Sequence, residues 1–498
     1  MLSDSPDQSS LIESFIFRSY DGGFEDHQFG NQNTNSESIV SSSENTKPSS
    51  ANQSRRKFLG TTTKIAAAGV AAGVVSGGEL SLARSAFAGG SDSMKIGLVG
   101  CGGRGSGAAN NALNTKSGNV QLAGVADVFE DRMNSMLKGV TKKHGEKVQV
   151  KDATKFIGFD AYEKLLDTDI DLVILATPPG FRPLHFEKAI EAGKHVFMEK
   201  PVAVDIPGVR RVLAASEMAR EKNLAVGVGL QRRHETKYRE TIQALKEGII
   251  GDLIYSRVYW NGPGVWLKAR KPGQSELDYQ MRNWYYFNWL CGDHIVEQHI
   301  HNLDVINWLL DDFPVSAQGQ GGRLIRNYKD TGHIFDHHAV EYTFKNGHKM
   351  MSQCRHMPEC WNHVDEWVHG AKGYAHISKG RIFNSDGKLI LHSKKPQGES
   401  NGWQEEHHHL FADISNGARP NEGEYGAMST MTAIVGRLAT YTGKMLKMEA
   451  AMKSNVSLAD VDNIRSFDDE APIQPNADGN YRVASPGKKY KEIIDWDA

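Results

Sequence analysis

The segment GDHIVEQHIHNLD, residues 292–304, carries side chains that could move protons. Acids and histidines recur in it at steps of three and four residues: His294, Glu297, His301 and Asp304. A continuous helix would place these four side chains on one stripe beside an apolar face. Such a stripe is costly next to a core unless its members are paired, hydrated or used in catalysis. This segment is therefore the first candidate for a catalytic site.

Two members of the stripe and one distant lysine fit the oxidation of a hydroxyl-bearing carbon. This chemistry needs a base for the hydroxyl, a cation near the developing alkoxide and a hydride acceptor. His301 suits the base, because imidazole titrates near neutral pH. Glu297 could orient His301 or relay its proton, and Lys200 could stabilise the alkoxide. The competing interpretation of His301 is a core histidine paired with Asp304.

The same stripe could instead hold zinc through His294, Glu297 and His301, because histidine and carboxylate one turn apart are common zinc ligands. The spacing does not match H-E-x-x-H, and the sequence signals no further ligand. The four cysteines form no CxxC pair, although Cys354 and Cys360 could form a disulfide. We therefore predict no metal site.

A glycine-rich loop points to the hydride acceptor. Residues 95–99 predict a buried strand, and residues 100–105 read Gly-Cys-Gly-Gly-Arg-Gly, which fits G-x-G-x-x-G. In that fingerprint the glycines allow a tight turn, a close approach to pyrophosphate and close helix packing. A second strand ends in Asp127, about twenty residues beyond the loop, where a ribose hydroxyl would be held. The combination predicts a dinucleotide site, and the Asp127 carboxylate favours NAD over NADP.

The alternation of apolar runs and helical patterns continues beyond this loop. Strands and helices are predicted in turn at residues 171–176, 183–191, 195–198, 207–222 and 224–228. This order predicts an α/β fold with a doubly wound parallel sheet. Ligands in such sheets lie beyond the carboxyl ends of the strands, which is where Asp127, Thr177 and Lys200 fall.

Three motifs in register resemble the glucose–fructose oxidoreductase/inositol dehydrogenase (Gfo/Idh/MocA) family over residues 94 to about 445. They are the glycine loop, Ala-Thr-Pro-Pro at 176–179 with His185 downstream, and GKHVFMEKP at 193–201. The resemblance implies an N-terminal Rossmann domain and a C-terminal α/β domain with a large, open, mostly antiparallel sheet. It also implies NAD(P)-dependent chemistry on sugars or polyols, and a homo-oligomer.

In the resembled family, the acid and histidine that face the nicotinamide match Glu297 and His301. This chain departs from the usual pattern, because the family has Asp at the first position and Gly where His299 stands. The resemblance and the fingerprint together predict these cofactor-binding residues: Gly100, Gly102, Gly103, Arg104, Gly105, Asp127, Thr177, Pro178, His185, Glu199 and Lys200. For the substrate we predict Arg282, Trp284, Tyr285 and Arg233, because aromatic faces stack on sugar rings and arginines reach hydroxyls.

The sequence divides into four predicted regions. Residues 1–53 are polar and predict a disordered extension. Residues 54–90 resemble a twin-arginine signal, with Arg55-Arg56, a weak apolar run and a small-residue cleavage site, which predicts export to the periplasm. Residues 94–225 predict the Rossmann domain and residues 226–498 the substrate domain.

Composition and motifs together favour an exported, NAD-dependent sugar oxidoreductase. The net charge of −2 argues against a nucleic-acid partner, and no segment predicts a stable membrane span. Free cofactor is kept in the cytoplasm, so an exported enzyme would retain its NAD and work in a redox-neutral cycle. One alternative is an NAD-dependent glycosidase of the α-N-acetylgalactosaminidase kind, which oxidises, eliminates and re-reduces. Another is a non-catalytic sugar-binding protein.

Overall fold

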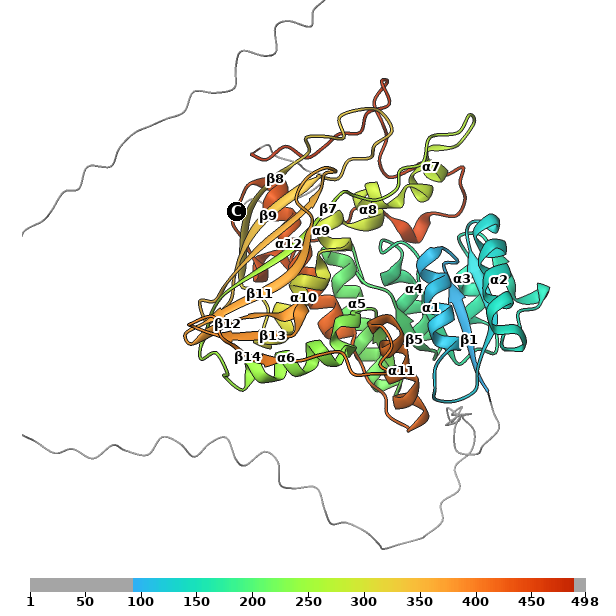
Figure 1. The fold of residues 1–498 in the computed structure, drawn as a ribbon. Helices are drawn as coiled ribbons and strands as arrows, with labels where there is room; N and C mark the ends of the chain where they lie inside the picture. The colour runs from blue at the N-terminus through green and yellow to red at the C-terminus, as the bar shows by residue number, and fades with distance from the viewer. Residues whose placement is uncertain (1–92, 488–498) are drawn as a thin grey trace, which may run out of the picture. The chain divides into compact units, whose positions relative to one another are not determined.

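The computed structural model describes residues 93–487 (Figure 1). The predicted extension at 1–53 and the predicted signal at 54–90 lie outside the described residues. The first domain holds a six-stranded parallel sheet in the order β3-β2-β1-β4-β5-β6. Its strands are β1 Met94–Val99, β2 Val120–Asp127, β3 Lys155–Ile157, β4 Leu172–Leu175, β5 His195–Met198 and β6 Val226–Val228. The predicted doubly wound α/β fold is confirmed.

Helices cover both faces of this sheet, so its central strands are almost wholly apolar. Every residue of β4 is buried, as expected for a strand packed on two sides. The helices are α1 Gly103–Leu113, α2 Glu130–His144, α3 Ala161–Leu166, α4 Arg182–Glu191 and α5 Ile206–Glu221. Asp205 caps α5 by accepting a hydrogen bond from Gly208 N at 2.8 Å.

The second domain is built on a nine-stranded sheet in the order β14-β13-β12-β11-β7-β10-β9-β8-β15. All neighbouring strands are antiparallel except β7 and β10. The strands are β7 Leu253–Gly262, β8 Ser316–Gly322, β9 His337–Thr343, β10 Lys349–His356, β11 His363–Gly370, β12 Gly373–His376, β13 Arg381–Asn384, β14 Leu389–His392 and β15 Leu446–Lys447. This arrangement confirms the mostly antiparallel second sheet.

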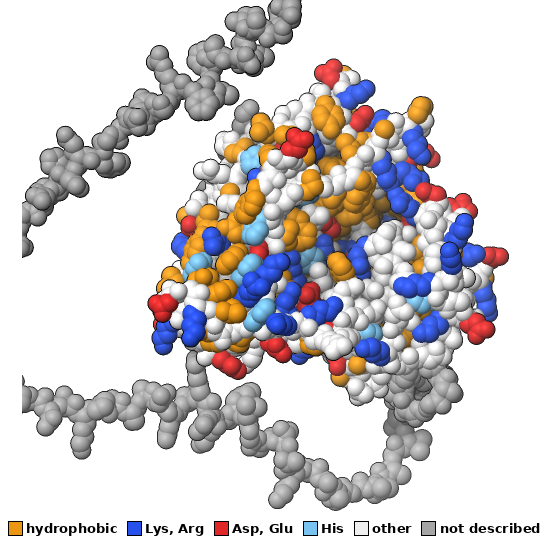
Figure 2. All heavy atoms as spheres, viewed as in Figure 1, with side chains coloured by type: hydrophobic (Ala, Val, Ile, Leu, Met, Phe, Trp, Pro, Cys, Tyr) orange, Lys and Arg blue, Asp and Glu red, His pale blue; other side chains and the backbone are white. Residues whose placement is uncertain are grey.

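One face of the second sheet carries helices, and the other is open in Figures 1 and 2. Side chains along β9 alternate between buried and half-buried, the pattern of a strand packed on one face only. The helices of this part are α6 Thr236–Lys246, α7 Glu276–Arg282, α8 Asn288–Cys291, α9 His294–Glu297, α10 Ile300–Leu310, α11 Gly402–Ser415, α12 Gly423–Thr442 and α13 Met448–Ala451. Trp361 and Val364 are among the exposed hydrophobic side chains of this domain.

The segment 292–304 is not the continuous helix that its spacing predicts. Two helices, α9 and α10, meet at Gln298 and His299. Lys200 Nζ donates to the main-chain carbonyl of Glu297, which a continuous helix would bond to the amide of His301. That amide bonds to the Gln298 carbonyl instead, at 3.3 Å. The single stripe is therefore broken, and its four members do not share one site.

The chain crosses back onto the first domain near its end, so the domains are not two simple halves. The β6 strand begins at residue 226, just beyond the predicted boundary, and its Val226 N donates to Pro420 O at 2.8 Å. Leu410, Phe411 and Ile414 of α11 pack into the core around β1 and α1. The four cysteines are free thiols in the described range, with Cys354 buried and Cys360 exposed. None of the helices within residues 93–487 is long and apolar enough to span a membrane.

Candidate active site at the end of the parallel sheet

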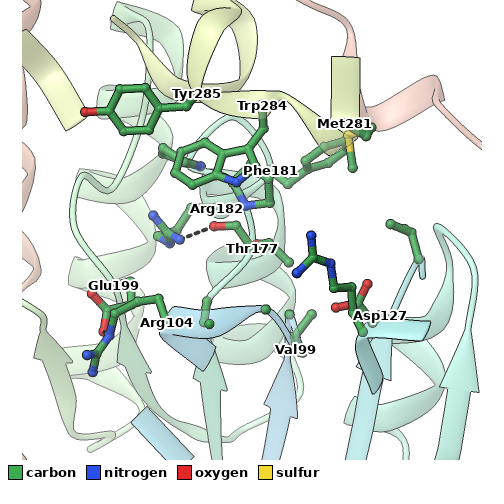
Figure 3. Close-up of a pocket in the computed structure, with 18 of the residues that line it drawn as sticks. Val99, Arg104, Asp127, Thr177, Phe181, Arg182, Glu199, Met281, Trp284 and Tyr285 are labelled. Atoms are coloured by element: carbon green, nitrogen blue, oxygen red, sulfur yellow. Dashed lines mark hydrogen bonds and ion pairs between the residues drawn. The ribbon is translucent and has the colours of Figure 1, made fainter. Parts of the chain in front are cut away.

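A cavity of about 650 Å³ runs along the carboxyl ends of the first sheet and under residues of the second domain. The glycine loop, Asp127, Thr177 and Lys200 contribute its lining from the first domain. Phe181, Met281, Trp284 and Tyr285 lie on the opposite side of the cavity in Figure 3. This is the place where open α/β sheets bind their ligands.

The glycine loop has one crowded side and one open side. Gly100 has φ +95°, and a Cβ there would come within 2.7 Å of the Ala176–Thr177 backbone. A Cβ on Gly105 would lie 1.8 Å from the Gly100 carbonyl oxygen, so helix α1 packs against the loop without space for a side chain. Beside Gly102 and Gly103 a Cβ would meet nothing within 4 Å. Of these four glycines, all but Gly105 line the cavity.

Arg104 and Glu199 bond to each other across the first domain. The Arg104 Nε–H donates to Glu199, whose side chain is 5% exposed, and both residues line the cavity. The Arg104 guanidinium also lies 6.0 Å from the ring of Trp403, which comes from α11. This ion pair links the glycine loop to the end of β5. No pattern in the sequence indicated Trp403.

Asp127 lies at the end of β2 and holds the loop as well as lining the cavity. Its carboxylate accepts hydrogen bonds from Cys101 N at 2.5 Å and Phe129 N at 2.8 Å. Burial raises the pKa of Asp127, although these two bonds favour its charged form. Arg132 also lines this end of the cavity, and the sequence reasoning missed it.

Thr177, Pro178 and His185 line the cavity beyond β4. Thr177 Oγ1 lies 3.2 Å from His185 Nδ1, and burial lowers the pKa of His185 to about 3. The buried Arg182, absent from the sequence-based set, donates to the Thr177 carbonyl and, at 2.6 Å, to the Pro201 carbonyl (Figure 3). Burial lowers the pKa of Arg182 to about 10. Arg182 thus ties together the turns that follow β4 and β5.

Lys200 and Glu297 form an ion pair between the two domains. Lys200 Nζ lies 3.0 Å from Glu297 Oε1, and it also donates to the Glu297 carbonyl. Both side chains are mostly buried, at 12% and 13% exposed, and both line the cavity. The peptide bond from Lys200 to Pro201 is cis. The pair places one cation and one carboxylate in the same wall.

His301 lies in the same cavity and is only 6% exposed. Burial, with Lys200, Arg232 and Arg104 nearby, holds the pKa of His301 well below its usual range. Its ring lies 5.9 Å from that of Trp260, with 23° between the planes. Within residues 93–487 its Nδ1 has no hydrogen-bond partner.

Asp304 is not the partner of His301, so the interpretation of His301 as a core histidine paired with Asp304 is wrong. Arg233 forms two hydrogen bonds with Asp304, at 2.9 and 2.8 Å, and stacks 4.0 Å over Tyr425. Arg233 is also not among the cavity residues, although the sequence assigned it to the substrate. A buried structural ion pair explains both side chains.

The other predicted substrate residues line the cavity at different places. Trp284 and Tyr285 form its upper wall in Figure 3, and burial and Glu297 raise the pKa of the Tyr285 phenol. Arg282 ion-pairs with Asp131 at 3.2 Å and lies 4.0 Å over the Phe129 ring, at the Asp127 end. The structure therefore separates Arg282 from Lys200, Glu297 and His301. Trp260, Trp266 and Gln298 also line the cavity, and the sequence reasoning missed all three.

The sequence of the first domain has recognisable relatives. Residues 94–230 match the GFO_IDH_MocA family, described as an oxidoreductase family with an NAD-binding Rossmann fold. The match covers the parallel sheet of the first domain and the residues just after it. Inositol 2-dehydrogenase 3 of Saccharopolyspora erythraea is 28% identical over 225 residues, 45% of this chain and 56% of that protein. The scyllo-inositol 2-dehydrogenase (NAD(+)) of Bacillus subtilis is 29% identical over 168 residues, 34% of this chain and 43% of that protein.

These matches span about half the length of the curated relatives. Solved structures extend the likeness of fold to both domains. Aldose–aldose oxidoreductase from Caulobacter crescentus superposes with a TM-score of 0.56 at 18% identity, covering 72% of this chain and all of that one. The scyllo-inositol dehydrogenase of Lactobacillus casei gives a TM-score of 0.53 at 22% identity and covers 98% of that chain. These solved structures share the fold of both domains.

Proposed function

We propose that this protein is an NAD-dependent oxidoreductase that acts on a sugar, polyol or glycoside by hydride transfer. The observation that carries the proposal is the ion pair of Lys200 and Glu297 beside His301, in the same cavity as the glycine loop. A base, a cation and a dinucleotide cradle in one cavity are the parts that such a reaction needs. The relatives with inositol dehydrogenase names act on hydroxyl-bearing rings, which supports this substrate class.

The cavity fits a dinucleotide at its first-domain end. The open space beside Gly102 and Gly103 is a cradle that any side chain would fill, and α1 begins there with its free amides. Asp127 would hold a ribose, and Thr177, Pro178 and His185 would flank the path towards Lys200. When bound there, NAD supplies the acceptor for a hydride from the substrate carbon.

His301 supplies the base in this account. Its pKa lies well below the usual range, so the imidazole is neutral at neutral pH and has a lone pair for the hydroxyl proton. Lys200 places a positive charge by the developing alkoxide, and Glu297 fixes the ammonium in place at 3.0 Å. Trp260, Trp266 and Trp284 line the remaining wall with aromatic faces on which a sugar ring can stack.

We propose NAD rather than NADP, because the Asp127 carboxylate can accept a hydrogen bond from the ribose 2′-hydroxyl of NAD and would repel the 2′-phosphate of NADP. We also propose export by the twin-arginine route with the cofactor already bound, on the strength of Arg55-Arg56 and the sequence after them. The open face of the second sheet, beside which Trp361 is exposed and packs against Tyr259, supports a homo-oligomer.

The test is the reduced-nicotinamide absorbance of the purified chain from Gly89 onward, without added cofactor, as sugars, polyols and glycosides are offered. A rise on adding one of these compounds supports the proposal. Release of the aglycone with no lasting rise would indicate the internally redox-neutral glycosidase. Binding of sugars without turnover, even with added NAD, would contradict the proposal and favour a non-catalytic sugar-binding protein.

A further inference from the structure

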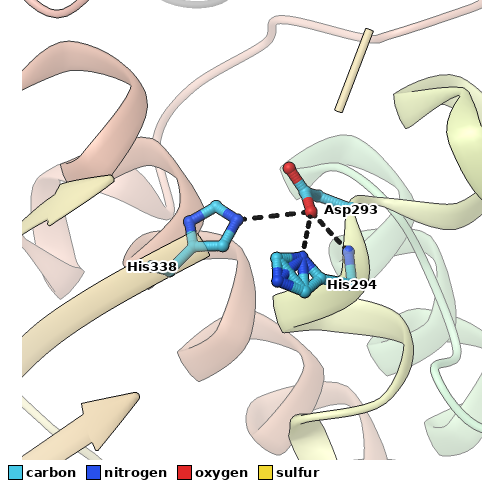
Figure 4. A group of neighbouring side chains, drawn as sticks. All are labelled: Asp293, His294 and His338. Atoms are coloured by element: carbon cyan, nitrogen blue, oxygen red, sulfur yellow. Dashed lines mark hydrogen bonds and ion pairs between the residues drawn. The ribbon is translucent and has the colours of Figure 1, made fainter. Parts of the chain in front are cut away.

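A second group of ionisable side chains lies outside the cavity and is sealed inside the second domain (Figure 4). Asp293 and His294 stand at the start of α9, and His338 lies on β9. All three are at most 2% exposed, and none of them lines the cavity. One ligand-type atom from each lies within 4.8 Å of the other two.

The two oxygens of the Asp293 carboxylate have different partners. Oδ2 accepts hydrogen bonds from Phe335 N at 2.9 Å and from the Tyr441 hydroxyl at 2.5 Å. Oδ1 accepts from the His294 amide and faces His294 Nδ1 at 2.8 Å and His338 Nε2 at 3.3 Å. The residue is held with φ +74°, an uncommon conformation outside glycine. Oδ1 is therefore aimed at two ring nitrogens.

The hydrogen bonds of His338 fix which of its nitrogens carries hydrogen. The Thr440 hydroxyl donates to the Arg437 carbonyl at 2.8 Å, so it accepts from His338 Nδ1, also at 2.8 Å. Nε2 of His338 faces the negative Oδ1 at 3.3 Å and has no other hydrogen-bond partner in the described part of the chain. A cation between Nε2 and Oδ1 would contact both atoms.

A third imidazole offers a further nitrogen. His356 lies with its ring 4.3 Å from that of His294, and its Nε2 donates to Gln298 Oε1 at 2.8 Å. Its Nδ1 is therefore a lone-pair nitrogen, and like His294 Nε2 it is buried without a hydrogen-bond partner between residues 93 and 487. Two imidazoles that face one carboxylate oxygen, with a third imidazole packed against them, form a set of donors typical of a transition-metal site.

We propose that Asp293, His294 and His338 bind a divalent transition metal, with Zn²⁺ the best fit. Two ligands of a tetrahedral zinc ion lie about 3.3 Å apart, given metal–ligand bonds of about 2.0–2.1 Å. The 3.3 Å between Asp293 Oδ1 and His338 Nε2 matches that spacing, whereas His294 Nδ1 lies closer, 2.8 Å from Oδ1. This ligand set differs from the stripe of His294, Glu297 and His301 that the sequence suggested and then excluded.

The site is structural, because protein atoms enclose it and no ligand position opens onto the cavity. The metal would fasten the start of α9 to β9, a few residues ahead of Glu297. This inference does not depend on the proposed hydride transfer. It concerns the rigidity of the segment that presents Glu297.

The test is the zinc content of the full chain, produced with zinc in the medium, freed of any purification tag and dialysed against a chelating resin. We expect about one zinc per chain, and close to none in His338→Ala. His348→Ala is the matched control, since His348 is also buried in this domain but bonds to Ser256 Oγ at 2.9 Å. Loss of zinc from a His408→Ala/His409→Ala variant, with His338→Ala retaining it, would overturn the proposal.

An anomalous difference map of wild-type crystals at the zinc edge gives an answer that needs no variant. A peak enclosed by Asp293, His294 and His338 supports the site even if His338→Ala fails to fold. A map with no peak there, after growth with zinc, would show that the group is a hydrogen-bonded network and would overturn the proposal.

Discussion

Two groups of acids and bases meet at helix α9 and differ in what surrounds them. Lys200, Glu297 and His301 line a cavity of about 650 Å³, whereas Asp293, His294 and His338 are sealed in the second domain. His294 and Glu297 are the two ends of the same short helix. Similar side chains therefore face the cavity at one end of α9 and only protein at the other. Access from the cavity decides whether a buried charged side chain can take part in catalysis or only stabilise the fold.

The separation depends on Lys200, which comes from a distant part of the chain. By bonding to the Glu297 carbonyl it interrupts the helix after α9, and α10 then presents His301 to the cavity. A continuous helix would have kept His294, Glu297 and His301 on one face. The broken helix therefore lets one segment contribute to two groups. We call Lys200, Glu297 and His301 the open group, and Asp293, His294 and His338 the sealed group.

The largest expected effect comes from removing the base of the open group. We expect His301→Gln to lower turnover about 10²–10⁴-fold, because the hydroxyl proton loses its acceptor. Steady-state kinetics with the best substrate from the absorbance screen measures this. His299→Gln is the matched control, since His299 is buried and bonds to Ser352 Oγ at 2.8 Å without lining the cavity. Equal losses in both variants would show that His301 acts only through packing.

Removing the cation of the open group should have the next largest effect. We expect Lys200→Met to lower turnover about 10²–10³-fold, since the alkoxide loses its stabilising charge. The control is Lys222→Met, because Lys222 donates to the Ile190 and Glu191 carbonyls and does not line the cavity. Unchanged turnover in Lys200→Met would remove Lys200 from the proposed site.

A change beside the sealed group should lower stability and leave turnover largely intact. Tyr441→Phe removes the hydroxyl that donates to Asp293 Oδ2 at 2.5 Å, so the buried carboxylate loses one donor. We expect the free energy of unfolding to fall by about 1–3 kcal/mol, with turnover changed only a few-fold. Urea unfolding followed by fluorescence gives the first value. A large loss of turnover at unchanged stability would erase the distinction between the groups.

The glycine loop contains the same contrast on a smaller scale. Gly105→Ala should destabilise the cofactor-free fold by about 1–3 kcal/mol, because its Cβ would lie 1.8 Å from the Gly100 carbonyl oxygen. Gly102→Ala should leave the free energy of unfolding unchanged and weaken NAD binding, because its Cβ enters open space at the cradle. Calorimetric titration with NAD and urea unfolding separate the two effects. Equal NAD affinity in Gly102→Ala and the wild type would place the dinucleotide elsewhere.

A buried histidine outside both groups gives the smallest effect and a baseline for pH dependence. Burial lowers the pKa of His195 to about 4, so between about pH 6.5 and 4 the unfolded chain binds a proton that the folded chain does not. The free energy of unfolding should therefore fall as the pH falls through this range. In His195→Asn the slope should be smaller by up to about 1.4 kcal/mol per pH unit. The Asn oxygen can replace Nδ1 as the acceptor for Ala225 N, so the variant removes the titrating group and keeps the hydrogen bond. An unchanged slope would therefore contradict this account.

The first domain was largely predictable, because its signals are local. A strand predicted at 95–99 is β1 at Met94–Val99, and the strand predicted at 195–198 is β5 as observed. The glycine pattern also indicated which positions must lack a Cβ, as Gly100 and Gly105 show. The domain boundary was less accurate, since β6 is a short strand at the edge of the sheet that pairs with residues near Asn421.

The second domain was harder, because its site depends on partners far apart in the sequence. The spacing of Asp304 and His301 suggested a pair, but Arg233 takes Asp304 from another helix. Nothing local to Glu297 signals that Lys200 will bond to its carbonyl and break the helix. The aromatic residues Trp260 and Trp266 did offer a signal, as Trp260 lies in the strand-like run that forms β7 and Trp266 follows shortly after it. The assigned roles of the open group remain predictions.

The measurement that tests the central claim most directly is deuterium transfer from substrate to cofactor. A sugar or polyol that the absorbance screen selects is labelled with deuterium at its hydroxyl-bearing carbons and incubated with the wild type, His301→Gln and Lys200→Met. Mass spectrometry then measures the label in the nicotinamide. The account predicts label in the wild-type cofactor and a strong reduction in both variants. Turnover of the labelled substrate with no deuterium ever reaching the nicotinamide would contradict hydride transfer in this cavity.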